Sequence, residues 1–276
     1  MRRHVRAALI AVFVSSAVGA FAQMSVQTDM DWPRGEIRIT ASRMLDAGMS
    51  PSDHPRALTA LEMELPPYIA EVIATLSWDD RGTIGDLIER EPAARTAVGE
   101  LARSFEREWS RLSEDRNAVE AAYTLDLDEV FGYLAPAPFP GKAAGAPISW
   151  TPVPEDGWSG IVIYAPSDLP VRGTPLKAKP VPALAARILT DDLEILADPS
   201  VRSGELLSYR TLADRGDTDD LVGRRPYLTM ARGLYGDHPC DIILSEEDSR
   251  RIMASESGRD ALASGRIVIL LDSFPE

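Results

Sequence analysis

One stretch decides the fold class of the chain's second half: Gly160-Ile161-Val162-Ile163-Tyr164-Ala165. Its apolar residues follow one another without the polar alternation of a half-exposed strand, which is typical of a strand buried on both faces. Similar short runs predict six more strands after it. The first two are expected to form a hairpin around Thr190-Asp191-Asp192. The expected strands cover residues 185–189, 193–197, 206–212, 227–232, 240–244 and 266–271.

A helix is predicted between the last two of these strands, over residues 246–264. Ser245 is a suitable N-cap, because its hydroxyl can accept a hydrogen bond from the first turn. Glu246, Glu247 and Asp248 stand in that turn, where negative charge complements the helix dipole.

The first half has the predicted order strand, helix, helix, strand. Residues 36–43 and 119–127 alternate as half-buried strands, whereas 54–77 and 92–112 carry apolar residues at steps of three and four. A kink or restart is expected at Pro66-Pro67, and Trp109 is expected in the core. A short helical turn is predicted to start at residues 83–86, and the two helices are expected to cover one face of a small sheet.

These patterns predict an α+β fold: a small sheet with two long helices, followed by a strand-rich mixed domain. Residues 135–156 are rich in Pro, Gly and Ala and show no regular period, so they are predicted to be a connector. We therefore expect an α/β N-terminal domain over 23–134 and a β-rich C-terminal domain over 157–276. Trp150 and Trp158 flank the connector and are expected to hold it in place.

The first 22 residues have the three-part pattern of a secretory signal peptide. Arg2, Arg3 and Arg6 provide the positive start, an apolar stretch follows to Val18, and Ala20-Phe21-Ala22 predicts cleavage before Gln23. The alternative is a membrane anchor, but the apolar stretch is shorter than the roughly 20 residues that span a bilayer. We expect a periplasmic or secreted protein with no membrane anchor after cleavage.

The charge of the chain argues against nucleic acid as a partner. Its formal net charge is −14 at pH 7, and loss of the signal peptide removes only basic residues. Such a chain repels phosphate backbones. The single cysteine, Cys240, excludes an intramolecular disulfide. Because Cys240 begins an apolar run, we expect its thiol to be buried.

The most reactive-looking spot is the turn that contains Asp237, His238, Cys240 and Asp241. A Cys–His pair or a metal site could form there. The alternative is a turn whose polar residues satisfy its own backbone, and strand alternation separates Cys240 from Asp241. The acidic stretch 214–220 lacks the glutamate that a calcium loop needs at its twelfth position, which is Arg225. No residue is therefore assigned as catalytic, cofactor-binding or metal-ligating, and no cofactor is expected.

Several segments resemble a family of exported bacterial proteins. The quoted run 160–165, the segment Val181-Pro182-Ala183-Leu184-Ala185-Ala186-Arg187-Ile188-Leu189 and the ending 266–270 resemble the LPP20/FlgP-like family. The opening from Asp31-Trp32 to Ser42 and the segment 78–86 look like the version in spirochaete periplasmic proteins. The lipid-anchor cysteine of lipoprotein members is missing. The resemblance implies an envelope protein, with a possible flagellar association.

Two functions follow as hypotheses. The first is a non-enzymatic periplasmic interaction or assembly protein, associated with the cell envelope or the flagellar motor, whose partners are proteins that dock on an exposed apolar patch or open strand edge. The alternative is an extracytoplasmic enzyme or small-ligand binder centred on the turn of Asp237, His238, Cys240 and Asp241. The oligomeric state stays open.

Overall fold

The structure is a computed structural model that describes residues 24–46, 48–135, 157–199 and 206–274. These residues form two compact units. The first unit combines the chain up to Ala74 with Ala93–Val130, and the second combines Thr75–Pro92 with the chain from Phe131 onward. The fold is α+β with a strand-rich second part, as the sequence predicted. The predicted signal peptide and residues 136–156, with Trp150, lie outside the described residues.

The first unit is built on an antiparallel sheet with the strand order β1-β2-β6-β5. Ile37 and Ile39 of β2 and Tyr123 of β6 are buried on one face, against which α1 packs. Phe105 meets the ring of Tyr123 edge-on, with 4.8 Å between the ring centroids. The elements of this part are β1 (Met24–Asp31), β2 (Glu36–Met44), α1 (His54–Glu64), α2 (Pro66–Ala74), α4 (Pro92–Leu101), β5 (Glu106–Leu112), β6 (Ala118–Asp126) and α5 (Leu127–Leu134).

Two long helical predictions need correction. The pattern over 54–77 restarts at Leu65, as the paired prolines predicted, but the second helix ends at Ala74. The helix predicted over 92–112 is wrong beyond Leu101, where the hydroxyl of Ser104 donates to the Leu101 carbonyl. Residues 106–112 instead form β5 on the edge of the sheet. Trp109 is consequently 38% exposed and does not lie in the core.

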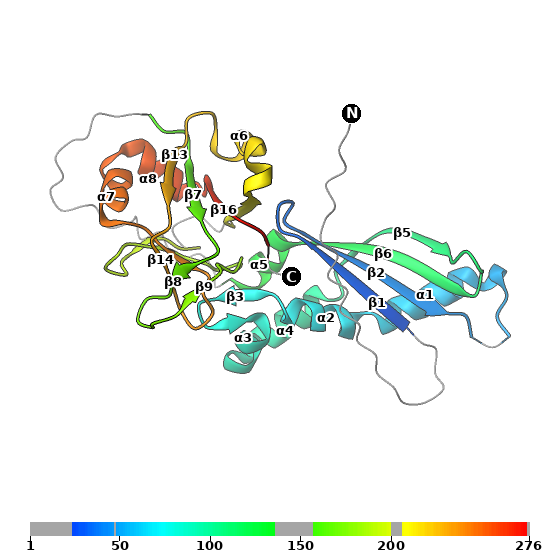
Figure 1. Cartoon of the computed structure of the whole chain (residues 1–276). Helices are drawn as coiled ribbons and strands as arrows, with labels where there is room; N and C mark the ends of the chain where they lie inside the picture. The colour runs from blue at the N-terminus through cyan, green and yellow to red at the C-terminus, as the bar shows by residue number, and fades with distance from the viewer. Residues whose placement is uncertain (1–23, 47, 136–156, 200–205, 275–276) are drawn as a thin grey trace. The chain divides into compact units, whose positions relative to one another are not determined.

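The described residues of the second unit form two four-stranded sheets, and Figure 1 shows β7, β13 and β16 of one of them. One has the order β12-β16-β7-β13 and is parallel throughout. The quoted run 160–165 forms β7 in its interior, with Ile161 and Ile163 fully buried. The other is mixed, with the order β11-β10-β15-β14, and includes the predicted hairpin. The strands are β7 (Ile161–Ala165), β10 (Ile188–Leu189), β11 (Ile195–Ala197), β12 (Ser208–Thr211), β13 (Tyr227–Met230), β14 (Gly233–Tyr235), β15 (Asp241–Ile243) and β16 (Ile267–Leu271).

The remaining elements of the second unit are short. The helix predicted over 246–264 is divided at Ser255, which caps the second piece, while Ser245 caps the first as predicted. Gly258 approaches the backbone of Ile252 so closely that a Cβ would lie 2.2 Å from its carbonyl oxygen, so the bend between the two helices requires glycine at this position. These elements are β3 (Ser77–Asp79), β4 (Gly82–Thr83), α3 (Ile84–Arg90), β8 (Leu169–Pro170), β9 (Lys177–Ala178), α6 (Asp219–Val222), α7 (Glu246–Ala254) and α8 (Glu256–Ala263).

No helix among the described residues is long and apolar enough to cross a membrane. The sequence boundary at 135–156 stays a prediction. The two compact units differ from the predicted domains in one segment. Thr75–Pro92 lies within the predicted N-terminal domain 23–134 but packs with the second unit.

Candidate functional site

The predicted reactive turn lies against the tip of the β3–β4 hairpin. The N–H of His238 donates to the Asp80 carbonyl at 3.0 Å. Gly236 has a φ of +101°, and a Cβ at this position would lie 2.5 Å from the Cβ of Asp80. The backbone therefore fits the hairpin only because residue 236 is glycine. Neighbouring N–H groups of Leu184 and Ala185 donate to the carbonyls of Ser77 and Trp78 and bond the hairpin to the rest of the second unit.

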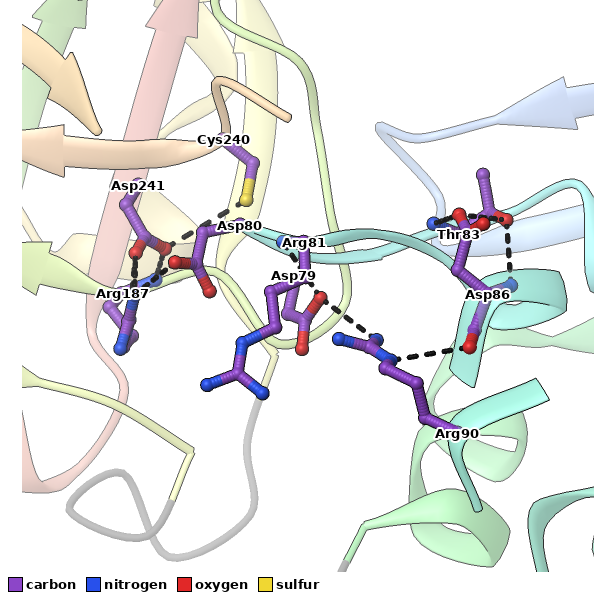
Figure 2. Close-up of polar contacts among 9 residues, drawn as sticks. All are labelled: Asp79, Asp80, Arg81, Thr83, Asp86, Arg90, Arg187, Cys240 and Asp241. Carbon is purple, nitrogen blue, oxygen red and sulfur yellow. Dashed lines mark hydrogen bonds and ion pairs between the residues drawn. The ribbon is translucent and has the colours of Figure 1, made fainter. Parts of the chain in front are cut away.

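Two ion pairs of Arg187 join three segments that are distant in sequence (Figure 2). Its partners are Asp241 at the start of β15 and Asp80 at the tip of the hairpin. Asp241 is fully buried and accepts hydrogen bonds from the Arg187 backbone N–H at 2.8 Å and from its Nε at 2.7 Å. The guanidinium of Arg187 also contacts the Asp80 carboxylate at 2.9 Å. Burial raises the pKa of the Asp241 carboxyl, and the Arg187 guanidinium opposes that shift. The arginine is thus held between two carboxylates.

Cys240 is buried, as predicted, and is 1% exposed. Its Sγ lies 3.8 Å from Oδ1 of Asp241. Burial and the neighbouring Asp241 carboxylate raise the pKa of the thiol well above its usual value. A thiol with a raised pKa is a poor nucleophile, because the thiolate is the reactive form.

Among the described residues, no hydrogen bond joins the side chain of His238 to that of Cys240. The Nε2 of His238 is buried and has no hydrogen-bond partner in the described part of the chain. Burial lowers the pKa of its imidazole, and the carboxylates of Asp79 and Asp86 oppose that shift. Cys240 and Asp241 are thus buried in contact with each other, whereas Asp237 is exposed and His238 is half-buried. Within the residues that the structure describes, no three His, Cys, Asp or Glu residues are placed to hold a metal ion.

Asp80 and Arg187 were not singled out from the sequence, although they define the geometry of this region. Asp79-Asp80-Arg81-Gly82 has the composition of an ordinary turn. Arg187 offered one signal, because it is the only charged residue in the run 181–189. A charge within a buried run needs a partner of opposite charge. Nothing local identified Asp80 and Asp241 as those partners.

A second candidate surface lies at the edge of the parallel sheet. β13 is its last strand and lies beside β7 (Figure 1). Leu228 and Met230 are 57% and 53% exposed, although both belong to the strand. Arg224, Arg225 and Arg232 flank it and are also exposed. We call Arg224 to Arg232 the β13 edge. It combines exposed apolar residues, positive charge and a strand edge that is open at Leu228 and Met230. Beyond them the Arg232 N–H donates to the Ile243 carbonyl at 2.8 Å.

Two domain families match the chain in succession. Residues 23–133 match the N-terminal domain of Treponema pallidum Tp0624, and residues 160–273 match its second domain. No curated protein matches the chain. The spirochaete part of the predicted resemblance is thereby confirmed, while the link to the LPP20/FlgP-like family stays a prediction. The two matches follow one another and together span most of the chain, so the protein is similar to these two Tp0624 domains in the same order.

Proposed function

We propose that the protein is a non-enzymatic interaction or assembly protein of the cell envelope, which works in the periplasm after export. The observation that carries this proposal is the exposure of Leu228 and Met230 on the β13 edge. A strand edge with exposed apolar side chains offers both backbone hydrogen bonds and apolar area to another protein. The signal-peptide pattern of residues 1–22 supports the location.

The Asp237–Asp241 turn fits a structural role in this proposal. Asp241 is bound by Arg187, and the turn's backbone is bonded to the β3–β4 hairpin. The alternative, an enzyme or small-ligand binder at this turn, has a distinct consequence. If it were correct, His238→Ala and Cys240→Ala would abolish a ligand-induced rise of the melting temperature. Under the proposed function these variants leave partner binding at the β13 edge unchanged.

The test is site-specific photo-crosslinking in the cells that make the protein. A photoreactive amino acid replaces Leu228 in one variant and Met63 in the control. Met63 lies on α1 in the first unit and is 77% exposed, so it matches the exposure without sharing the surface. We expect a discrete crosslinked envelope protein from position 228 and none from position 63. Equal labelling at both positions, or none at either, contradicts the proposal.

Export and association with the envelope need two further measurements. The mature protein isolated from the periplasmic fraction should begin at Gln23. Deletion of the gene should make the cells more sensitive to detergent, because the envelope is weakened. A loss of motility in the same cells would support a flagellar association. Retention of residues 1–22 in a cytoplasmic protein would exclude export, and unchanged envelope integrity and motility would argue against the assembly role.

A further inference from the structure

We infer that the β13 edge binds an extended, acidic segment of a partner protein, which adds to the parallel sheet as a further strand. The inference rests on the proposed function and specifies the chemistry of the partner. Three features of the edge carry it: the direction of its backbone groups, the exposure of its side chains and the sign of its flanking charges.

The backbone of β13 has polar groups directed away from the sheet. Tyr227 and Ala231 donate their N–H groups to the carbonyls of Gly160 and Tyr164, both at 2.8 Å. Backbone groups alternate sides along a strand, so the N–H and C=O groups of Leu228 and Met230 face the open side. In the described part of the chain no strand follows β13 in the sheet order. An added strand would satisfy these groups.

The side chains of the same two residues form an apolar strip. Leu228 pairs with Val162 and Met230 with Tyr164, so the strip continues the face that carries these β7 residues. That face is partly covered by Val222 of α6, and Tyr164 and Leu221 are only half-buried there. Alternate apolar side chains of an added strand would lie beside Leu228 and Met230 and continue this surface.

Another edge of the protein shows what a protected edge looks like. β5 is the outer strand of the first unit's sheet, and its register shifts between Arg107 and Trp109. Its exposed residues include Glu106, Glu108 and Arg111, and Arg111 lies over the Trp109 ring. A bulge and charges within the strand oppose edge-to-edge pairing. β13 pairs with β7 in unbroken register and carries no charged residue between Tyr227 and Met230.

The charges at its ends determine which strand the β13 edge accepts. Arg224 and Arg225 precede β13 and Arg232 follows it, in a chain whose net charge is −14. The acidic residues nearest in sequence are Asp219 and Asp220, which lie on α6 before the arginines, and the exposed Asp237, which follows Arg232. In antiparallel pairing of two copies, the arginines before one β13 would meet Arg232 of the other. This repulsion disfavours a second copy, whereas a segment with acidic ends would be attracted at both.

The test uses a nine-residue acetylated peptide with alternating Val and Thr in its centre and two glutamates at each end. It is titrated into the mature protein, and binding is followed by fluorescence anisotropy of a dye on the peptide. The control peptide has lysines in place of the glutamates. We expect the acidic peptide to bind at least about tenfold more tightly than the lysine peptide, and the difference to shrink as salt screens the charges.

The variant Arg224→Glu/Arg232→Glu reverses the charges of the edge. Its matched control is Arg56→Glu/Arg95→Glu, which makes the same change in net charge at exposed helical positions of the first unit. We expect about a tenfold or greater loss of binding in the first variant and none in the control. Far-ultraviolet circular dichroism confirms that both variants are folded, and a gain of lysine-peptide binding by the first variant gives a readout that misfolding cannot produce.

The outcomes separate this inference from the proposed function. Equal binding of both peptides, absence of binding, or equal losses in the two variants overturns the acidic-strand inference. If position 228 still crosslinks to an envelope protein in cells, the interaction function stands and only the partner's chemistry is wrong. If the acidic peptide binds but position 228 captures no envelope protein in cells, the inferred chemistry of the edge stands and the proposed function fails.

Discussion

Arg187 is the residue on which the second unit's polar contacts depend most. Its guanidinium connects a fully buried carboxylate, Asp241, with Asp80 on the β3–β4 hairpin. A buried carboxylate that loses its cation leaves an uncompensated charge, which costs far more than the pair contributes. The exposed pair of Lys177 and Asp168 has the same chemistry in water and is expected to contribute little.

The first prediction compares these two cations. Arg187→Met should lower the free energy of unfolding by about 3–5 kcal/mol, because Asp241 stays buried without its partner. Lys177→Met should change it by no more than about 1 kcal/mol. Urea unfolding of the two variants, followed by circular dichroism, measures both changes. If the two variants unfold at the same urea concentration, the Arg187 network does not stabilise the fold.

Single residues were predictable where the chemistry is local. Ser245 was recognised as an N-cap from its hydroxyl and the acidic turn after it, and the structure confirms that its Oγ accepts from the Asp248 N–H at 3.0 Å. The burial of Cys240 followed from the apolar run it begins. The partners of Arg187 could not be predicted, because Asp80 and Asp241 come from segments that only the tertiary fold brings together.

At the scale of elements, the β3–β4 hairpin owes its position to a close backbone approach. Gly236 has a φ of +101° and faces the Asp80 carbonyl, from which a Cβ would be 2.6 Å away. Gly173 is a useful comparison, since its φ is +83° but nothing lies within 4 Å of a Cβ there. The two glycines share the conformational requirement and differ in the space around them.

The second prediction follows from that comparison. Gly173→Ala should cost about 1–2 kcal/mol of stability, which is the price of a left-handed residue with a side chain. Gly236→Ala should cost at least about 1 kcal/mol more, because the hairpin backbone must also move. Thermal unfolding of the two variants tests the difference. Equal melting temperatures of the two variants would mean that the hairpin backbone moves away from residue 236 without a loss of stability.

The third prediction concerns the capping box of α3, at the end of the same hairpin. The Asp86 carboxylate accepts from the Thr83 N–H at 2.7 Å and from the Thr83 hydroxyl at 2.9 Å, and these bonds lower the pKa of Asp86 below 3.8. An unfolded Asp86 keeps the usual pKa, so the stabilisation is complete above that value. It is lost as the pH falls through the lower pKa of the folded state.

Melting temperatures measured from pH 7 down to about pH 2.5 should therefore show a specific pattern. Asp86→Asn should melt below the wild type at pH 7, and the difference should close in the acidic range. Glu89→Gln, at an exposed position of the same helix, should leave the wild-type profile intact. A difference between Asp86→Asn and the wild type that stays constant over this range would contradict the capping assignment.

Strands were predicted correctly where the hydrophobic pattern fitted a strand and not a helix. The alternating runs gave β2 and β6, and the continuous apolar runs gave β7, β15 and β16. β5 was mistaken for helix because Phe105, Trp109 and Leu112 are spaced by three and four, while Glu and Arg between them are good helix formers. Pairing with β6 outweighs this local preference. β1 was not predicted at all.

At the scale of the whole molecule, the second unit requires a segment that lies far earlier in the chain. Thr75–Pro92 belongs to it and supplies Asp80 and the backbone partners of Leu184, Ala185 and His238. The match to the second Tp0624 domain begins only at residue 160. Residues 160–273 of this chain, taken alone, lack the β3–β4 hairpin that bonds to Leu184, Ala185, Arg187 and His238.

The fourth prediction follows from this dependence. A fragment of residues 157–276 should unfold at a lower temperature than the same residues in the mature protein, and a synthetic peptide of residues 75–92 should raise its melting temperature by mass action. The same peptide with Asp80→Asn should raise it less, because Arg187 loses one carboxylate. If the fragment is as stable as the intact protein, or if the two peptides act alike, the hairpin is dispensable.

Amide hydrogen exchange reports whether an acidic strand adds to the β13 edge. In the free protein the Leu228 and Met230 amides, which face the open side, should exchange quickly, whereas those of Tyr227 and Ala231 are bonded to β7. Addition of the acidic peptide should slow exchange at Leu228 and Met230 and leave Tyr227 and Ala231 nearly unchanged. If saturating peptide leaves exchange at Leu228 and Met230 as fast as before, no strand has been added and the acidic-strand inference is wrong.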